Sequence, residues 1–282
     1  HELLEFIKNS PRKYNVYQIP KRTSGTRTIA QPTAELKKYQ RYLVSIFTPI
    51  LPVHKNAFAY VQGKSIKDNA LVHSRNSYFL KMDFSNFFNS ITPNIFWNFF
   101  EETNIKFSGL DRILLSHLLF WKPSKYQQNL VLSIGAPSSP LISNFCMYKF
   151  DVVISEFCKN NNITYSRYAD DLTFSTNNKP FLDKQSEFLS EVTKEIERSG
   201  FKVNNKKTRI LFRDSRQEVT GLIVNEKISV NRKYYKKSRA MAYQLYKSGS
   251  FEIDSEEGST NQLEGRFAFI NQLDWYNNKR DG

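Results

Sequence analysis

Three aspartates stand at positions where short β-strands are expected to end. Asp170 and Asp171 lie between two runs of β-forming residues, which predicts a hairpin with both carboxylates at its tip. Asp83 follows an apolar run, where a charge is costly unless it is paired or binds metal. Each site also has a plain structural interpretation, because Asp170 and Asp171 suit a solvated turn and Asp83 suits a helix cap.

Taken together, the two sites indicate a more specific chemistry. Three carboxylates on adjacent strand ends can hold two Mg²⁺ ions about 3.5–4 Å apart, the arrangement used for in-line phosphoryl displacement. One ion would lower the pKa of an attacking hydroxyl, and the other would neutralise charge on a leaving pyrophosphate. In a basic protein, this cluster indicates a polymerase or a nuclease.

The charge of the chain indicates a polyanionic partner. The 282 residues carry 41 Lys and Arg against 27 Asp and Glu, a net charge of +14. Residues 8–41 hold nine Lys and Arg against Glu35 alone, net +8, and residues 202–239 hold twelve against three acids, net +9. The rest of the chain is therefore −3. A solubilising surface would predict a more even spread, so nucleic acid is the expected partner.

Composition excludes several other classes of protein. With 40% hydrophobic residues, the chain can bury a core, which excludes intrinsic disorder. No run approaches the ~20 consecutive apolar residues of a membrane span, and no signal segment is seen. His1 in place of an initiator Met points to a processed or shortened start. Cys146 and Cys158 are too few for a disulfide scaffold or a zinc site, so we expect packing roles in a reducing cytoplasm.

The elements that must position these residues mix strands and helices irregularly, which indicates an α+β fold. The expected strands are Tyr14–Pro20, Arg27–Ala30, Tyr78–Phe84, Ile163–Tyr168 and Leu172–Ser175. Helices are expected after the capping residue Thr33, from Pro93, and over Ser139–Phe150, Phe181–Ser199, residues 231–247 and Leu263–Leu273. A basic turn is expected at Lys21–Gly25, a C-cap at Gly200 and a mobile loop at Lys247–Asn261.

Four ordered motifs resemble those of reverse transcriptases. The run Tyr168-Ala169-Asp170-Asp171 matches the YxDD box of that family, and Phe79–Phe88 resembles its first catalytic motif. Gly135–Asn144 matches the GAPxSPxxSN segment, and Gly200–Thr208 matches GxxxNxxKT. The shared order of these motifs argues against a chance match.

This resemblance implies an RNA-directed DNA polymerase with a right-hand fold. Fingers would span residues 1–77 with part of 93–130, and the palm, an antiparallel sheet carrying the carboxylates, would lie in 78–228. A helical thumb would follow in 229–282.

The resemblance also implies where catalysis and metal binding take place. Asp83, Asp170 and Asp171 would be catalytic, with two Mg²⁺ ions as cofactor and Mn²⁺ as a possible substitute. The implied metal-binding residues are Asp83, Phe84, Asp170 and Asp171. Lys207 would protonate or neutralise the departing pyrophosphate, and its neighbour Lys206 is the competing candidate.

Nucleotide-binding residues are implied in two other segments. Lys21 and Arg27 would bind the triphosphate, with plain surface charge as the alternative. Phe88 matches a steric gate that excludes the ribose 2′-OH, although only one of Phe87 and Phe88 can face the site, and a core aromatic is the alternative. The set is completed by Gly135, Ala136 and Pro137. Ile134 stands where the family usually carries Gln, which leaves open any polar contact from this position.

Two short segments resemble bacterial retron enzymes in particular. Asn69–His73 fits their NAxxH signature, and Val219–Gly221 fits their VTG signature, for which a plain strand turn is the alternative. The residues expected to bind nucleic acid are Asn69, His73, Ser138, Ser139, Val219, Thr220, Gly221, Arg232, Lys233, Lys236, Lys237 and Arg239. The last five lie in a basic helix that could instead be a core helix with a solvated face.

A retron enzyme would copy its own structured noncoding RNA from dNTPs, starting at a 2′-OH within that RNA, into branched RNA-linked DNA (msDNA). Such systems resemble phage-defence modules with a separate effector protein, and no membrane partner is expected. Three alternatives stay open: another bacterial reverse transcriptase such as a group II intron type, a non-catalytic RNA-binding scaffold with the same fold, and a two-metal nuclease.

Overall fold

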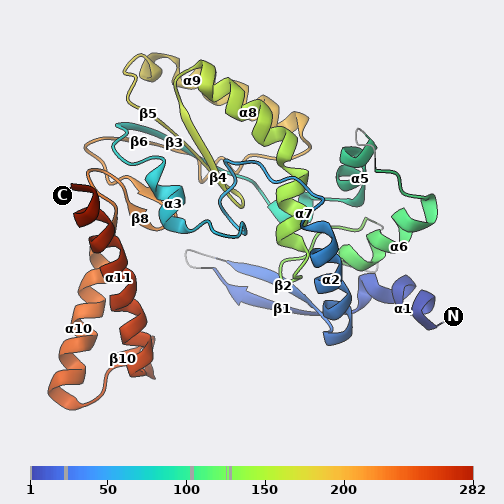
Figure 1. Ribbon diagram of the computed structural model, residues 1–282, viewed down its shortest axis with the longest axis horizontal. Coiled ribbons are helices and arrows are strands. Elements are labelled where there is room, and N and C mark those ends of the chain that lie inside the picture. Colours follow the sequence, from blue (N-terminus) through green and yellow to red (C-terminus); the bar gives the residue numbers. More distant parts are fainter. Residues whose placement is uncertain (1, 22–24, 102–104, 125, 127–128, 282) are drawn as a thin grey trace.

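An antiparallel sheet of four strands lies at the centre of the molecule, which Figure 1 shows as a computed structural model. The structure describes residues 2–21, 25–101, 105–124, 126 and 129–281, so most of the expected turn at Lys21–Gly25 lies outside it. The strand order is β4-β5-β3-β6. The strands are β3 (Tyr78–Asp83), β4 (Thr164–Tyr168), β5 (Asp171–Thr176) and β6 (Arg209–Phe212). Their mixture with helices agrees with the expected α+β fold.

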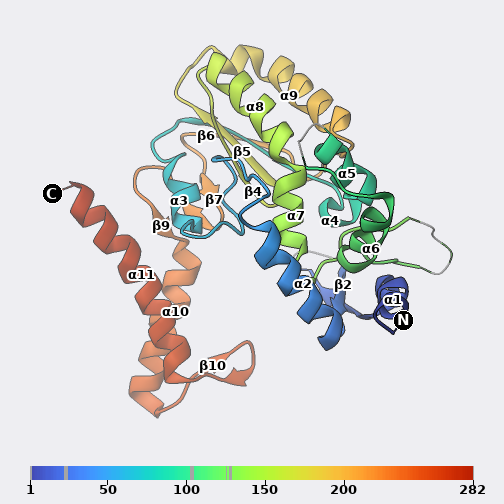
Figure 2. The same cartoon turned by 45° about the vertical axis from the view of Figure 1, so that its right-hand side comes forward.

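One face of this sheet is covered by two long helices, α8 (Tyr148–Asn160) and α9 (Phe181–Arg198) (Figures 1 and 2). Leu80, Met82 and Phe174 from the strands pack with both helices in the largest hydrophobic cluster. Because side chains alternate along a strand, these residues occupy every second position on one side of the sheet.

The opposite face packs on a short helix and a second, smaller sheet. Phe79 of β3 alternates with Leu80 and Met82 and so points to this face. It packs with Ala70 of α3 (Ile66–Leu71) and with Val219 and Leu222. The smaller sheet contains β7 (Glu218–Val219), β8 (Leu222–Ile223) and β9 (Ser229–Val230), in that order. The Asp83 and Asp171 positions belong to this second face, since they alternate with Met82 and Leu172.

The N-terminal part of the chain forms a separate lobe. Its elements are α1 (Glu2–Asn9), the 3₁₀-helix η1 (Ser10–Arg12), β1 (Tyr14–Pro20), β2 (Thr26–Pro32), α2 (Ala34–Phe47) and, from later in the chain, α6 (Gly109–Leu119). Ile7, Leu36 and Leu118 form its hydrophobic cluster. Thr33 precedes α2 as expected, although its side chain makes no capping hydrogen bond.

Three shorter helices join this lobe to the sheet: α4 (Phe87–Ser90), α5 (Pro93–Glu101) and α7 (Ser139–Cys146). The single helix expected over Ser139–Phe150 is wrong, because the chain breaks between α7 and α8 at Met147. The break lets α7 pack on α5, where Phe145 meets Phe96 and Phe100, while α8 turns onto the sheet.

A helical hairpin at the C-terminus projects away from the sheet (Figures 1 and 2). It contains α10 (Arg232–Ser248), β10 (Glu252–Ile253), β11 (Glu256–Glu257) and α11 (Thr260–Asp281). The loop expected at Lys247–Asn261 instead holds the β10–β11 pair, because Phe251 is buried with Met241 and Leu263 and anchors it. Among the described helices, none has the length and apolar character required to span a bilayer.

Candidate active site

The pairing of β3 with β5 places two aspartates directly opposite each other. Asp83 is the last residue of β3 and pairs with Asp171, the first residue of β5. Asp170 lies in the two-residue turn between β4 and β5, and its carbonyl accepts a 3.1 Å hydrogen bond from the N–H of Phe84. The three carboxylates therefore belong to neighbouring strand ends at one edge of the sheet.

The environment of these carboxylates disfavours their charged forms. Partial desolvation raises the pKa of Asp171 to about 6 while the residue stays exposed at the sheet edge, and the charge of Asp170 adds to the shift. Loss of hydration also raises the pKa of Asp170, with Asp83 as the next cause. A divalent cation would counter both effects, because it stabilises the ionised oxygens.

The donor set fits Mg²⁺, which prefers carboxylate and other oxygen ligands. Within the part of the chain that the structure describes, no three His, Cys, Asp or Glu side chains already converge as a metal cluster. The cation at Asp83 is instead Lys207, whose Nζ donates to Oδ2 at 2.7 Å. Phe84 can contribute only its main chain to a metal, because its ring is buried against Phe87.

The segment after α9 carries Lys207 to this carboxylate. The N–H of Asn204 donates to the Asp83 carbonyl at 2.7 Å, and its Nδ2 donates to Asp83 Oδ1 at 3.1 Å. Of the two adjacent lysines, it is Lys207 that contacts Asp83. Partial burial alone would lower the pKa of Lys207, but the hydrogen bond and charge of Asp83 more than offset this and raise it.

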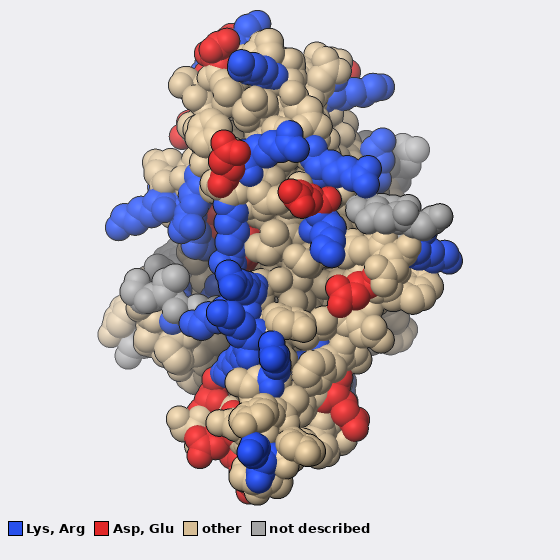
Figure 3. Space-filling model, turned by 90° about the vertical axis from the view of Figure 1, so that its left-hand side faces the viewer, with Lys and Arg blue, Asp and Glu red and all other residues tan. Residues whose placement is uncertain are grey.

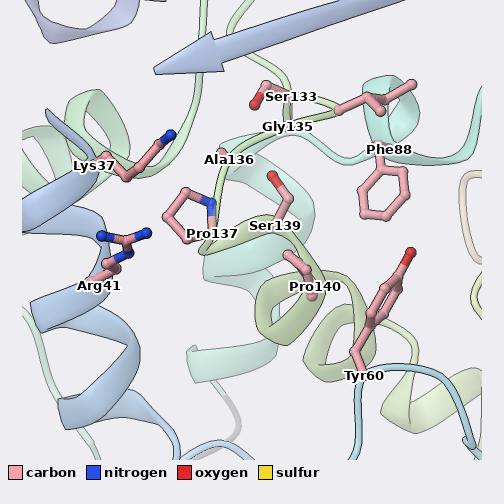
Figure 4. A pocket seen from close by; sticks show the side chains of 11 residues that line it. Lys37, Arg41, Tyr60, Phe88, Ser133, Gly135, Ala136, Pro137, Ser139 and Pro140 are labelled. Carbon is pink, nitrogen blue, oxygen red and sulfur yellow. The ribbon is translucent and has the colours of Figure 1, made fainter. Parts of the chain in front are cut away.

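A pocket of about 330 Å³ opens between the N-terminal lobe and the segment before α7 (Figure 4). Phe88 and Tyr60 face each other at one end of it, with ring centroids 6.4 Å apart (Figure 4). Phe87 is 3% exposed and packs in the core, so Phe88 is the member of this pair that faces the pocket. Asp170 contributes to the raised pKa of Tyr60, after desolvation by burial, which links this end of the pocket to the carboxylates.

The backbone of Gly135, Ala136 and Pro137 lines the pocket beside these rings. Gly135 has φ +125°, and a Cβ there would lie 3.1 Å from the carbonyl oxygen of Ala30. The N–H of Ala30 donates to the Ile134 carbonyl at 2.9 Å, so β2 is bonded directly to this loop. Ile134 presents an apolar side chain to the pocket where the family pattern has Gln.

Two buried serines follow in the same segment. Ser139 is 2% exposed, lines the pocket and points its hydroxyl into it (Figure 4). Ser138 is fully buried and is not among the lining residues. Neither hydroxyl has a hydrogen-bond partner among the described residues.

Four pocket residues, Lys37, Arg41, Tyr60 and Ser133, were not identified from the sequence. Lys37 and Arg41 extend from α2 on the side of the pocket opposite Phe88 and Tyr60 (Figure 4). Their spacing of four residues places them on one face of the helix, which is a signal that the sequence contains. That this face meets the segment before α7 depends on tertiary packing, which the spacing does not reveal.

The two cations expected to bind triphosphate lie at different places on the first hairpin. Arg27, on β2, is exposed, and its charge is one of the influences that lower the pKa of Asp170 against the larger effect of burial. Lys21 follows β1 and is exposed, and its N–H donates to the Gly25 carbonyl. Arg27 is thus the one close enough to act electrostatically on a carboxylate.

Asn69 and His73 do not lie where nucleic acid could touch them. Their side chains are 1% and 0% exposed. His73 Nδ1 and Nε2 lie 2.6 and 2.7 Å from the hydroxyls of Ser175 and Ser166. Burial lowers the pKa of His73 to about 3, so the ring is neutral. The expectation of direct contact with nucleic acid is corrected for these two residues, and His73 instead joins strands β4 and β5 of the central sheet.

The second retron signature forms a tight turn. Val219 is fully buried, while Thr220 and Gly221, with φ +48° and +86°, link β7 to β8. The Thr220 hydroxyl donates to the Ile66 carbonyl of α3 at 3.0 Å. Ala70 of the first signature packs with Val219, so the two signatures meet. The expected contact of Val219 with nucleic acid is corrected, because this residue is 0% exposed, and only Gly221 is exposed at the turn.

The five basic residues expected at the thumb are all exposed on α10. Lys237 is paired with Asp254 at 2.8 Å. Helical spacing aligns Arg232, Lys236 and Arg239 on the side away from the buried Met241. Figure 3, which views this side of the molecule, shows Lys and Arg side chains gathered in a continuous band.

Comparisons with known proteins identify the family. The family "Reverse transcriptase (RNA-dependent DNA polymerase)" matches residues 19–240. The chain is 38% identical over 264 residues to Retron Ec83 reverse transcriptase of Escherichia coli, covering 93% of this chain and 83% of that protein. It is 34% identical over 284 residues to Retron Mx162 reverse transcriptase of Myxococcus xanthus, covering 93% of this chain but only 58% of that longer protein.

The fold has a counterpart among solved structures. Telomerase from Candida albicans, in complex with a fragment of telomeric RNA, superposes with a TM-score of 0.53 at 14% identity, over 83% of this chain and 50% of that one. This similarity concerns the fold alone and identifies the sheet and its surrounding helices as the reverse transcriptase polymerase fold. Because the family match covers most of the chain and the sequence relatives are retron enzymes, the chain is an RNA-directed DNA polymerase that belongs to the retron reverse transcriptases.

Proposed function

We propose that this enzyme copies a structured noncoding RNA into DNA at Asp83, Asp170 and Asp171, using two divalent metal ions. The observation that carries the proposal is the adjacency of these carboxylates at one sheet edge, beside a pocket walled by Phe88 and Tyr60. The three aspartates and the Phe84 main chain would hold Mg²⁺ or Mn²⁺. Bound there, the ions would lower the pKa of the attacking hydroxyl and neutralise charge on the leaving pyrophosphate.

The chain's own cations act on the phosphates in this proposal. Lys207 would donate a proton to the departing pyrophosphate or neutralise it, which its contact with Asp83 through Nζ supports. Arg27 would bind the triphosphate, because its charge already acts at Asp170. Lys21 would join it if the hairpin closes over the nucleotide.

Phe88 would select deoxynucleotides. This proposal depends on its ring facing the pocket. A sugar bound between Phe88 and the backbone of Gly135, Ala136 and Pro137 would have no room for a 2′-OH. Tyr60, across the same end of the pocket, would limit movement of the nucleotide base.

Lys37 and Arg41 would hold the template strand. They lie at the end of the pocket away from Phe88, whereas a triphosphate bound by metal must lie toward the carboxylates (Figure 4). An anionic ligand for these two side chains is therefore a different phosphate from the incoming one. The buried hydroxyl of Ser139, which points into the pocket, can complete the contact.

The domain boundaries remain a proposal, which hydrophobic clusters in the N-terminal lobe, the central sheet and the C-terminal hairpin support, while a further cluster crosses the boundaries through Ala70, Phe79 and Leu273. Fingers over residues 1–77 with part of 93–130 agree with the cluster around Ile7, Leu36 and Leu118. A palm over 78–228 agrees with the central sheet and its helices, and a thumb over 229–282 agrees with the α10–α11 hairpin. The thumb's basic side would follow the RNA-containing duplex through Arg232, Lys233, Lys236, Lys237 and Arg239.

The retron relatives support the finer proposal that synthesis starts at a 2′-OH within the cognate RNA and yields branched msDNA. The partners would then be that RNA, its DNA product, dNTPs and a retron effector protein, and the biological role would be anti-phage defence in the cytoplasm. Gly221 and the neighbouring signature turn would contact the RNA.

The test is a primer-extension assay on an RNA template with Mg²⁺ and dNTPs, together with sequencing of nucleic acid that co-purifies with the protein. We expect DNA synthesis and a branched RNA–DNA species. Synthesis without any branched species in the producing cells would refute the retron-specific priming while leaving the polymerase intact.

A further inference from the structure

A charged side chain lies fully buried directly beneath the turn that carries Asp170. Arg167, on β4, is 0% exposed and is paired with Asp151 of α8, which is also fully buried. Its Nε donates to Asp151 Oδ1 at 2.9 Å, and its Nη2 donates to Oδ2 at 2.7 Å. The Tyr165 hydroxyl donates to the same carboxylate at 2.6 Å.

The remaining guanidinium nitrogen reaches the turn itself. Arg167 Nη1 donates to the carbonyl of Ala169 at 3.2 Å and to Asn144 Oδ1 at 3.1 Å. Ala169 has φ +56°, in the left-handed region that residues with a Cβ rarely adopt. The buried cation therefore holds the one residue whose backbone conformation decides where Asp170 points.

Asn144 extends the same network to the wall of the pocket. Its Nδ2 donates to the Ala59 carbonyl at 2.9 Å. The next residue, Tyr60, also has a left-handed backbone, at φ +61°, and its ring faces Phe88 across the pocket (Figure 4). Both unusual backbone conformations are thus bonded, directly or through Ala59, to side chains of one buried network.

The main chain of Arg167 reinforces this connection. Its N–H donates to the Asn56 carbonyl at 2.8 Å, and its carbonyl accepts from the N–H of Phe58 at 2.9 Å. The segment leading to Tyr60 therefore meets β4 at a parallel β-bridge between Ala57 and Arg167, and the metal-binding turn and the pocket wall share one support.

A buried ion pair often contributes no more to stability than apolar residues of the same volume, so stability alone does not account for this one, whereas its bonds to the turn do. We propose that Arg167 and Asn144 are positioning residues, which set the Ala169–Asp170 turn and the Tyr60 wall in register with each other. This inference rests on the proposed roles of Asp170 and Asp171 as metal ligands.

The test compares two variants with the wild type. Arg167→Lys keeps the charge but loses the paired hydrogen bonds of the guanidinium to Asp151, and Asn144→Ala removes the amide. Ser116→Ala is the matched control, because its hydroxyl is a buried acceptor for Trp97 Nε1 at 2.8 Å and lies outside this network. Mn²⁺ binding is measured by electron paramagnetic resonance without nucleotide, and single-turnover nucleotide addition is measured on an RNA template.

We expect both network variants to bind Mn²⁺ about fivefold or more weakly and to add nucleotide about tenfold or more slowly, with RNA affinity unchanged. Excess metal ion should partly restore their rate. Ser116→Ala should lose thermal stability and keep wild-type Mn²⁺ affinity, which separates positioning from general destabilisation.

Wild-type Mn²⁺ affinity and rate in Arg167→Lys would overturn the proposal, and if that variant does not fold, the same result in Asn144→Ala would do so. Asp170→Asn is measured in parallel. If Asp170→Asn keeps both Mn²⁺ affinity and synthesis, the proposed metal site itself fails. If Asp170→Asn loses both while the network variants behave as wild type, only the positioning inference fails.

Discussion

Phe87 and Phe88 are adjacent in the chain and have opposite surroundings. Phe87 stacks on Phe84 inside the core, whereas Phe88 faces Tyr60 across the pocket. The direction of each side chain follows from the short helix α4, which turns successive residues by about 100°. At the residue scale, function therefore depends on which of two chemically identical neighbours the backbone turns outward.

Phe88→Ala should admit ribonucleotides, because removal of the ring opens space for a 2′-OH. We expect the preference for dNTP over NTP to fall about tenfold or more, which corresponds to about 1.4 kcal/mol. The measurement is competitive incorporation of dCTP and CTP on an RNA template. Phe87→Leu is the control and should lower stability without changing sugar selection. If Phe88→Ala leaves the preference for dNTP unchanged, Phe88 does not contact the sugar.

His73 should make folding stability depend on pH in a defined window. Its pKa is about 3 in the folded protein, below the usual 6.5 of the unfolded chain. Only the unfolded state takes up this proton below pH 6.5, so the stability present above that pH is lost as the pH falls toward 3. Relative to His73→Gln, the wild type should lose up to about 1.4 kcal/mol per pH unit.

The measurement is urea unfolding of the wild type and His73→Gln between about pH 7.5 and 5, within the window that linkage defines. The difference between their unfolding free energies isolates His73 from the other histidines. A difference that stays constant over this range would show that the ring is not held neutral by burial.

At this scale, the sequence predicts those site residues that lie at the ends of strands. Asp83, Asp170 and Asp171 could be grouped because charged residues that end apolar runs signal a shared sheet edge. Burial could not be judged from motifs. Asn69 and His73 belong to a recurring signature, yet a signature residue can recur because it packs, and the hydrogen bonds to Ser166 and Ser175 are contacts distant in sequence.

At the scale of elements, the pocket is built where four segments meet: α2, the segment that contains Tyr60, α4 with Phe88, and the chain from Ser133 into the start of α7. The bond from Ala30 to Ile134 joins the first hairpin to this last segment, and Gly135 is the point of closest approach. The strands up to β5 and most of the long helices were predicted, since periodicity and punctuation are local, but α1, α3, α4, α6 and the short strands from β6 onward were not. The break at Met147 and the contribution of Lys37 and Arg41 were not predicted either, because both result from packing between distant elements.

Gly135→Ala should disturb this junction by both backbone strain and contact with Ala30. At φ +125°, with its Cβ 3.1 Å from the Ala30 carbonyl, the substitution should cost about 1–3 kcal/mol of unfolding free energy. It should also raise the KM for dNTP. Gly63→Ala is the matched control, because φ is +77° there and a Cβ would meet nothing within 4 Å. Equal effects of the two substitutions would exclude the Ala30 contact.

The basic side of α10 makes a prediction that depends on salt. Replacing Arg232, Lys236 and Arg239 by Gln should weaken RNA–DNA binding and make the slope of log K against log salt shallower, by up to about 0.9 per lost phosphate contact. Filter binding between about 50 and 200 mM salt measures this slope. Lys237→Gln should change it less, because Lys237 is paired with Asp254. An unchanged slope in the triple variant would mean that this face is only solvated.

For the whole molecule, the charge distribution agrees with the arrangement of the elements. The two basic segments, net +8 and +9, flank the carboxylate edge in sequence, and a band of Lys and Arg is visible on the side that carries the C-terminal hairpin (Figure 3). A net charge alone indicated nucleic acid. The basic residues are divided between the first lobe and a segment that runs from the chain after α9 into α10, so we expect a nucleic-acid duplex to be bound on both sides of the carboxylates.

The most direct test of the central claim is single-turnover DNA synthesis on an RNA template by Asp170→Asn, with RNA affinity and thermal stability measured on the same preparation. The account predicts that synthesis falls by at least about a thousandfold, as for loss of a catalytic group. RNA affinity should stay unchanged, and stability should be kept or increased, because a like charge leaves the carboxylate cluster. Synthesis by this variant at the wild-type rate would contradict the account.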